Sequence, residues 1–247
     1  MTPAERRALE EAAARAWPPH ETLARDGWVL RFSGGGSQRA NSVLTLAWEG
    51  GDAEAAIDAA ERDYRARGQK PIFQIVDISL PADLDARLAA RGYDSIDRTL
   101  LMTKAVAPAG EPALAVSRHR EAPPAWLGIY LATLTPDRRA AAPAIIAALP
   151  ELKCFFVAAK DGAPAGVGLG MAEPPWCGVE CMATADAARR GGAARAVLAD
   201  LERWAGEMGA TRLWLQVLER NAPARVLYEG LGFEAVGSYW YRHAPGG

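Results

Sequence analysis

The sequence predicts a mixed α/β (α+β) fold, and three observations lead to that prediction. Short runs rich in valine, leucine, isoleucine and aromatic residues alternate with longer segments whose apolar residues recur at helical spacing. A glycine ends a helical segment, as Gly68 does after a helix expected over 53–67. With 247 residues, 50% of them hydrophobic, the chain can bury one large core or two smaller ones.

In the first half, a strand that begins at Trp28 is expected to end at the glycines Gly34, Gly35 and Gly36. Strands are expected over 28–32, 41–48, 71–78 and 94–104, and helices over 1–17, 53–67 and 82–90. The stretch 105–112 is nearly free of large apolar residues, which indicates a linker. We therefore expect an N-terminal module over 1–105, a linker over 106–117 and a C-terminal domain over 118–247.

The second half is expected to contain a hairpin whose turn is Asp161-Gly162. Its strands are expected over 154–159 and 165–171, after helices over 125–134 and 138–149. A third strand over 176–184 precedes a long amphipathic helix, and a strand, a helix over 222–231 and a last strand over 239–242 follow.

A weak internal repeat links the two halves. In each half a helix ends at glycine, a buried strand carries one glutamine (Gln74 or Gln216), and a second helix ends in Gly-Tyr or Gly-Phe. Duplicated or paired domains would give this pattern, although the helices of any αβαβ unit can end at glycines in a similar way.

Composition and charge exclude several classes of function. The formal net charge is -2 and no block of lysine or arginine occurs, so no nucleic-acid partner is expected. No apolar run approaches the length of a membrane span, so no membrane association is expected. Three cysteines and no secretory signal favour reduced thiols in a cytoplasmic protein, and the scattered histidines predict no metal site.

The most informative segment runs from Val179 to Phe233. A short apolar strand is followed by Arg189-Arg190-Gly191-Gly192-Ala193-Ala194-Arg195, which leads directly into the long helix. The free N–H groups and the dipole of a helix start attract anions, and small residues allow a phosphate to approach the backbone. The alternative is a small-residue helix start that only packs against a sheet.

Two common nucleotide-binding patterns are absent from the sequence. There is no G-x-x-x-x-G-K-[ST] motif, and Gly166-Val167-Gly168-Leu169-Gly170 has its glycines at every second position inside a predicted strand. We interpret these glycines as one strand face that another element approaches closely.

Two motifs together resemble the GNAT N-acetyltransferase superfamily. Arg189-x-x-Gly192-x-Ala194 is similar to its pyrophosphate motif, and Asn221-x-x-Ala224 followed by Tyr228-Glu229-x-Leu231-Gly232-Phe233 resembles its second signature. The resemblance covers the C-terminal half, and it implies a mixed central sheet flanked by helices. The first half resembles a degenerate module of tandem members, and Glu49 and Asp52 would repel phosphates there, so we expect no cofactor in that module.

The resemblance also implies how acetyl-CoA, the expected co-substrate, would be held. Its pyrophosphate would bind the backbone of the arginine- and glycine-rich turn, and its pantetheine arm would pair with the strand before it. Asn221 would hydrogen-bond this arm, although it also suits a helix N-cap. The expected binding residues are Met182, Ala183, Thr184, Arg189, Arg190, Gly191, Gly192, Ala193, Ala194, Arg195, Asn221 and Tyr228.

The expected reaction is direct attack of an amine on the acetyl thioester in a ternary complex. Tyr228 is the candidate general acid, because a phenol with an ordinary pKa near 10 can protonate a thiolate. Many relatives have a glutamate where this chain has Gln216, so Glu180, expected to alternate with Met182 and Thr184, is the candidate base. A water relay without a dedicated base is the alternative.

The acceptor is expected to be a primary amine on a small molecule or a peptide, and the protein a monomer or a homodimer. The alternatives are a non-catalytic module that binds acyl-CoA, or an enzyme with a different acyl donor.

Overall fold

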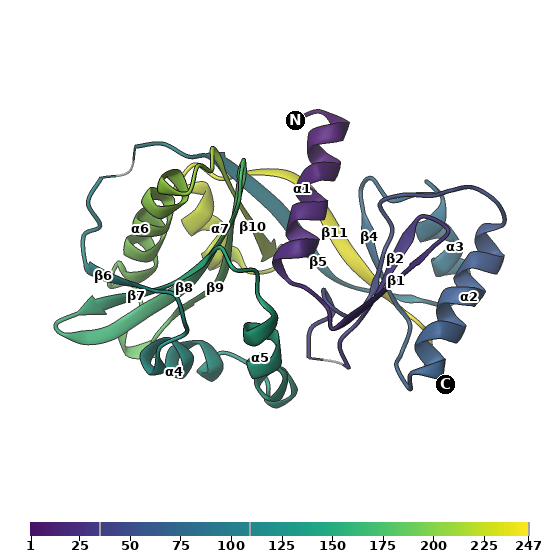
Figure 1. Ribbon diagram of the computed structural model, residues 1–247, viewed down its shortest axis with the longest axis horizontal. Coiled ribbons are helices and arrows are strands. Elements are labelled where there is room, and N and C mark those ends of the chain that lie inside the picture. The colour runs from purple at the N-terminus through teal and green to yellow at the C-terminus, as the bar shows by residue number, and fades with distance from the viewer. Residues whose placement is uncertain (35, 109, 247) are drawn as a thin grey trace. The chain divides into compact units, whose positions relative to one another are not determined.

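The computed structural model describes residues 1–34, 36–108 and 110–246, which form two compact units (Figure 1). Unit 1 comprises Met1–Leu101, Val217–Leu231 and Ala235–Gly247, and unit 2 comprises Met102–Gln216 and Gly232–Glu234. The chain passes between the units within three strands, β5 (Asp94–Ala105), β10 (Arg212–Leu218) and β11 (Glu234–His243), and also between Leu231 and Gly232. The module boundaries expected at 1–105 and 118–247 stay predictions. Gly35 and Ala109 lie outside the described residues.

Unit 1 contains a sheet in the order β1-β2-β3-β4-β11, in which only the β3–β4 pair is parallel. The C-terminal strand therefore belongs to the sheet of the N-terminal residues. The elements of unit 1 are α1 (Pro3–Ala16), β1 (Glu21–Arg25), β2 (Trp28–Phe32), β3 (Val43–Leu44), α2 (Ala53–Ala66), β4 (Ile72–Val76), α3 (Leu84–Ala90), α7 (Ala222–Glu229) and β11 (Glu234–His243).

Three elements of unit 1 differ from the sequence prediction, and one of them is β11, which begins at Glu234 and not at residue 239. β1 was not predicted because it is a polar edge strand, which pairs with β2 through a turn in which Asp26 and Gly27 have φ of 52° and 88°. The strand expected over 41–48 shrinks to Val43–Leu44. The strand ends at Leu44. At the next residue the side-chain hydroxyl of Thr45 donates a hydrogen bond to the Gln74 carbonyl at 3.1 Å.

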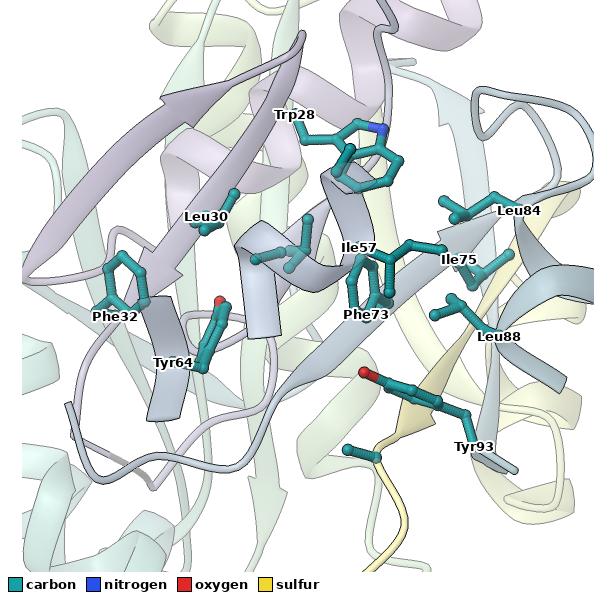
Figure 2. Packing of buried hydrophobic residues seen from close by; sticks show 14 residues of the cluster. Trp28, Leu30, Phe32, Ile57, Tyr64, Phe73, Ile75, Leu84, Leu88 and Tyr93 are labelled. Atoms are coloured by element: carbon teal, nitrogen blue, oxygen red, sulfur yellow. The ribbon is translucent and has the colours of Figure 1, made fainter. Parts of the chain in front are cut away.

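The core of unit 1 lies between the sheet and the helices α2 and α3, as Figure 2 shows for its aromatic and aliphatic side chains. Trp28 packs edge-on against Phe73, with ring centroids 5.7 Å apart, and its indole donates to the Leu80 carbonyl at 2.8 Å. The buried cluster includes Trp28, Leu30, Phe32, Ile57, Tyr64, Phe73, Ile75, Leu84, Leu88 and Tyr93.

A charged contact fastens β11 to α3. Arg242 on β11 pairs with both carboxylate oxygens of Asp85 at 2.8 and 2.9 Å, and the Trp240 indole donates to the same carboxylate at 2.8 Å. The hydrogen bonds from Arg242, with a smaller contribution from Trp240, hold the pKa of Asp85 below its ordinary value.

Replacing Asp85 with asparagine should lower the free energy of unfolding by about 1–2 kcal/mol at neutral pH, because Arg242 loses its charged partner. The folded pKa of Asp85 lies below the unfolded one, so this stability is present above the unfolded pKa and disappears as pH falls through the folded pKa. Urea denaturation of both proteins should therefore show a difference that shrinks below about pH 4. Asp83→Asn, in an exposed pair with Arg87, is the control, and an equal loss there would contradict the assignment.

Unit 2 contains a sheet in the order β10-β9-β8-β7-β6, with a parallel β9–β10 pair and antiparallel neighbours elsewhere. Helix α6 covers one face and α4 the other (Figure 1). The elements of unit 2, besides the parts of β5 and β10, are β6 (Ala115–His119), α4 (Pro124–Ala132), α5 (Pro136–Ala148), β7 (Lys153–Lys160), β8 (Ala163–Glu173), β9 (Trp176–Thr184), a 3-10 turn η1 (Asp186–Ala188) and α6 (Ala193–Glu207).

The hairpin of β7 and β8 is confirmed, and its turn has positive φ at Asp161 (52°) and Gly162 (79°). The end of the expected linker is wrong, because residues 115–117 belong to β6, which pairs with β7. This polar strand lacks an apolar alternation, and Arg118 anchors it to Asp200 of α6 at 2.7 Å.

The glycine-lined face of β8 is also confirmed as a place of close approach. A Cβ atom at Gly166 would lie 2.9 Å from Ala193 Cβ, one at Gly168 would lie 2.7 Å from Val197, and one at Gly170 would lie 2.8 Å from Trp204. All three neighbours belong to α6. The glycines therefore let this helix lie directly on the sheet, and no nucleotide-binding loop is formed there.

Candidate active site

The start of α6 has the geometry of an anion site. Gly192 is its N-cap residue with φ of +85°, and the first backbone bond of the helix runs from Ala196 to the Gly192 carbonyl at 3.0 Å. Among the described residues no side chain caps this helix. The N–H groups of residues 192–195 therefore point out of the helix end without an acceptor inside the helix.

Small residues keep this turn accessible. Gly192 is exposed, and a Cβ atom there would have no described neighbour within 4 Å, whereas a Cβ atom at Gly191 would come within 2.9 Å of the Ala188 carbonyl oxygen. Arg190 also has a positive φ, of 59°, which makes the turn tight. Ala193 is buried against β8, so its backbone faces the turn while its side chain supports the helix.

Positive charge surrounds the turn. Arg190 and Arg195 are exposed, and Arg189, also exposed, pairs with Asp186 at 2.8 Å. Lys160, at the end of β7, was not predicted: a Cβ atom at Gly191 would meet its Nζ at 3.2 Å. Lys160 is far from the turn in sequence, and only the hairpin that ends there brings it close.

The corresponding helix start in unit 1 is different. The Asp52 carboxylate accepts hydrogen bonds from the backbone N–H groups of Glu54 at 2.9 Å and Ala55 at 3.4 Å. A side-chain carboxylate thus already occupies the donors at the start of α2 and adds negative charge there. Of the two helix starts, only that of α6 presents a free set of donors.

β9, the strand that precedes the turn, pairs with β10 along only part of its length. β10 pairs with β9 from Arg212 opposite Trp176 to Leu215 opposite Val179. Among the described residues, the register gives Met182, Ala183 and Thr184 no partner on β10. This stretch of edge has the hydrogen-bonding pattern to which an extended ligand can add like a strand.

The expectation that Glu180 shares one face of the strand with Met182 and Thr184 is wrong. Leu169 on β8 pairs with Glu180 and Val167 pairs with Ala183, so Gly168 alone faces both Cys181 and Met182. This β-bulge, with φ of +53° at Cys181, breaks the alternation along β9. Met182 lies with Gly168 on the α6 face, whereas Glu180 shares the face of Leu169, toward α4 and its Tyr130.

Most of the second signature lies on α7 in unit 1, whereas its last residues, Gly232 and Phe233, belong to unit 2. Asn221 is the N-cap of α7, and its side chain accepts from the Ala224 N–H at 3.3 Å, as expected for one of its two roles. Tyr228 is buried on the same helix. The catalytic and pantetheine-binding roles of these residues rest on the sequence motif and stay predictions.

The described part of the chain lacks two further kinds of feature. It contains no group of three or more His, Cys, Asp or Glu side chains that could hold a metal ion. None of its helices is both long and apolar enough to cross a membrane.

Comparisons with known proteins show which family the chain belongs to. Residues 3–242 match the family model described as "Probable histone acetyltransferase Rv0428c C-terminal". The chain is 30% identical to the uncharacterized N-acetyltransferase YobR of Bacillus subtilis, over 96% of this chain and 97% of that protein. It is 32% identical to the probable histone acetyltransferase Rv0428c of Mycobacterium tuberculosis, over 92% and 70% of the two chains.

Solved structures share the fold. A GCN5-related N-acetyltransferase from Kribbella flavida superposes with a TM-score of 0.69 and 16% identity, over 99% of this chain and 96% of that one. A tandem GNAT protein from the clavulanic acid biosynthesis pathway superposes with a TM-score of 0.60 and 14% identity, over 98% and 96%. The chain therefore belongs to the family of the Rv0428c C-terminal region, and it is an acyltransferase of the N-acetyltransferase class with a GNAT fold.

Proposed function

We propose that this protein transfers the acetyl group of acetyl-CoA to a primary amine, on a small molecule or a peptide. The observation that carries the proposal is the uncapped start of α6, where the free N–H groups of residues 192–195 meet the exposed charges of Arg190 and Arg195. A pyrophosphate has the charge and the oxygen acceptors that such a helix start binds.

The donor would extend from this turn along β9. Its pantetheine arm would pair with the edge at Met182, Ala183 and Thr184, and the thioester carbonyl would lie close to the N–H groups of the same strand. Those N–H groups would stabilise the negative charge that develops on the carbonyl oxygen during attack.

Two proton transfers complete the reaction. The amine nitrogen bonds to the carbonyl carbon, the C–S bond breaks, and Tyr228 gives its proton to the departing thiolate. The proton that the amine loses goes to Glu180, directly or through water. Glu180 lies on the α4 face of β9, so we propose that the amine approaches from that face.

Calorimetric titration tests the donor part of the proposal. We expect acetyl-CoA to bind one-to-one, and acetylpantetheine, which has the same thioester arm but no pyrophosphate, to bind at least about 30-fold more weakly. The loss of even one charge-assisted hydrogen bond corresponds to about 2 kcal/mol. Equal affinity for the two donors would contradict a pyrophosphate site at α6, and the absence of acetyl transfer to every amine in a broad panel would contradict the reaction.

A further inference from the structure

Two aromatic residues of α4 contact β8 and β9 at the bulge in β9. At the bulge, Cys181 and Met182 lie opposite the single residue Gly168, and Cys181 has φ of +53°. A non-glycine residue in this left-handed region costs about 1–3 kcal/mol and persists only where its surroundings impose it. Contacts around Cys181 must therefore stabilise this backbone conformation.

The first contact comes from Trp126, which is fully buried. Its indole N–H donates to the Gly168 carbonyl at 2.8 Å, at the position on β8 that faces the bulge. The Trp126 ring also packs edge-on against Phe155 of β7, with centroids 5.0 Å apart. The donor atom is thus fixed in place by the sheet itself.

The second contact comes from Tyr130, one helical turn further along α4. Its hydroxyl is hydrogen-bonded with the Cys181 thiol, and burial, together with Cys181, raises the pKa of this phenol above its ordinary value. The Tyr130 ring lies 4.8 Å from that of Trp126. Residues at i and i+4 share one face of a helix, so α4 contacts both strands of the bulge with a single face.

The opposite face of the sheet also fits the bulge. Gly168 has no side chain, and a Cβ atom there would lie 2.6 Å from Met182 Sδ and 2.7 Å from Val197. The Met182 side chain therefore fills the space that Gly168 leaves under α6. The bulge is thus held by hydrogen bonds from the α4 face and by close packing on the α6 face.

We propose that Trp126 and Tyr130 are positioning residues for acyl transfer, which hold the bulge and so set the direction of the N–H groups of Met182, Ala183 and Thr184. This inference rests on the function proposed above, because those N–H groups are the ones assigned to the thioester. Neither aromatic residue is proposed to contact the substrate. Their effect is on catalytic geometry, where a misplacement of about 1 Å can cost about 100-fold in rate.

The test uses Trp126→Phe and Tyr130→Phe, which remove one donor or hydroxyl each and keep an aromatic ring. Trp204→Phe is the matched control, since Trp204 is also a buried tryptophan of unit 2, but it packs on the α6 face against Phe156. Three quantities are measured: kcat, the dissociation constant of acetyl-CoA by calorimetry, and amide hydrogen exchange of the peptide 180–185.

We expect kcat to fall about 10- to 100-fold in both α4 variants, with the affinity for acetyl-CoA changed less than about 3-fold, since the turn at α6 is intact. Exchange in 180–185 should rise in these variants and not in the Trp204 control. Unchanged exchange and kcat, or an equal change in Trp204→Phe, would overturn the proposal.

Hydrogen exchange separates this proposal from the proposed function. If the unaltered protein acetylates no amine, the reaction fails as a proposal, but faster exchange in 180–185 would still show that Trp126 and Tyr130 hold the bulge. If transfer occurs and both aromatic variants keep full kcat, the reaction stands and the positioning role is overturned.

Discussion

Replacing Gly192 with aspartate is expected to weaken acetyl-CoA binding at least about 30-fold, whereas asparagine at the same position should leave most of the affinity. The carboxylate would stand at the N-cap of α6, beside the N–H groups proposed to hold the pyrophosphate. Two like charges about 4 Å apart near a protein surface repel each other by more than the 2 kcal/mol that a 30-fold change requires.

The two variants isolate charge from backbone shape. Gly192 has φ of +85°, and asparagine and aspartate tolerate the left-handed region about equally, so both variants carry the same strain. An acidic group also favours a helix start, so aspartate should not melt α6. Calorimetry with a thermal unfolding curve for each protein checks this. Equal affinities of the Asn and Asp variants would mean that no phosphate binds at this turn.

Tyr228→Phe is expected to lower kcat by about 100- to 1000-fold, because general acid catalysis typically contributes about 10²–10⁴-fold. The affinity for acetyl-CoA should change little, since the variant keeps the ring. Steady-state kinetics combined with calorimetry measure the two effects separately. A proportional loss of kcat and affinity would point to a binding role for the hydroxyl.

Tyr93→Phe is a suitable control for this loss of a hydroxyl. Tyr93 is buried in unit 1, and its hydroxyl donates to Glu61 at 2.9 Å, outside the proposed machinery. We expect its kcat to equal that of the unaltered protein. If Tyr228→Phe behaves like Tyr93→Phe, Tyr228 is not the general acid.

Features set by neighbours in the chain were predicted well from the sequence. The glycines of the turn at α6, the Asp161-Gly162 hairpin turn and the N-cap role of Asn221 each depend on a few adjacent residues. Their backbone angles and hydrogen bonds are local, so residue type is enough to predict them. The motifs around them also led to the right family.

Features that depend on a partner strand were missed or predicted wrongly. The edge strands β1 and β6 are polar and become strands only because β2 and β7 pair with them. The strand face predicted for Glu180 was wrong because of the bulge in β9. A bulge arises from the register of two strands, so the alternation along one strand does not reveal it.

The sequence by itself therefore determined the glycine-rich turn at α6 and the family, since both lie in contiguous residues whose local conformation follows from their type. Only the tertiary structure decided which face Glu180 occupies, that Lys160 stands beside the turn, and that β11 joins the sheet of the N-terminal residues. These depend on contacts between residues far apart in the chain, whose pairing is selected by burial and register in the folded protein.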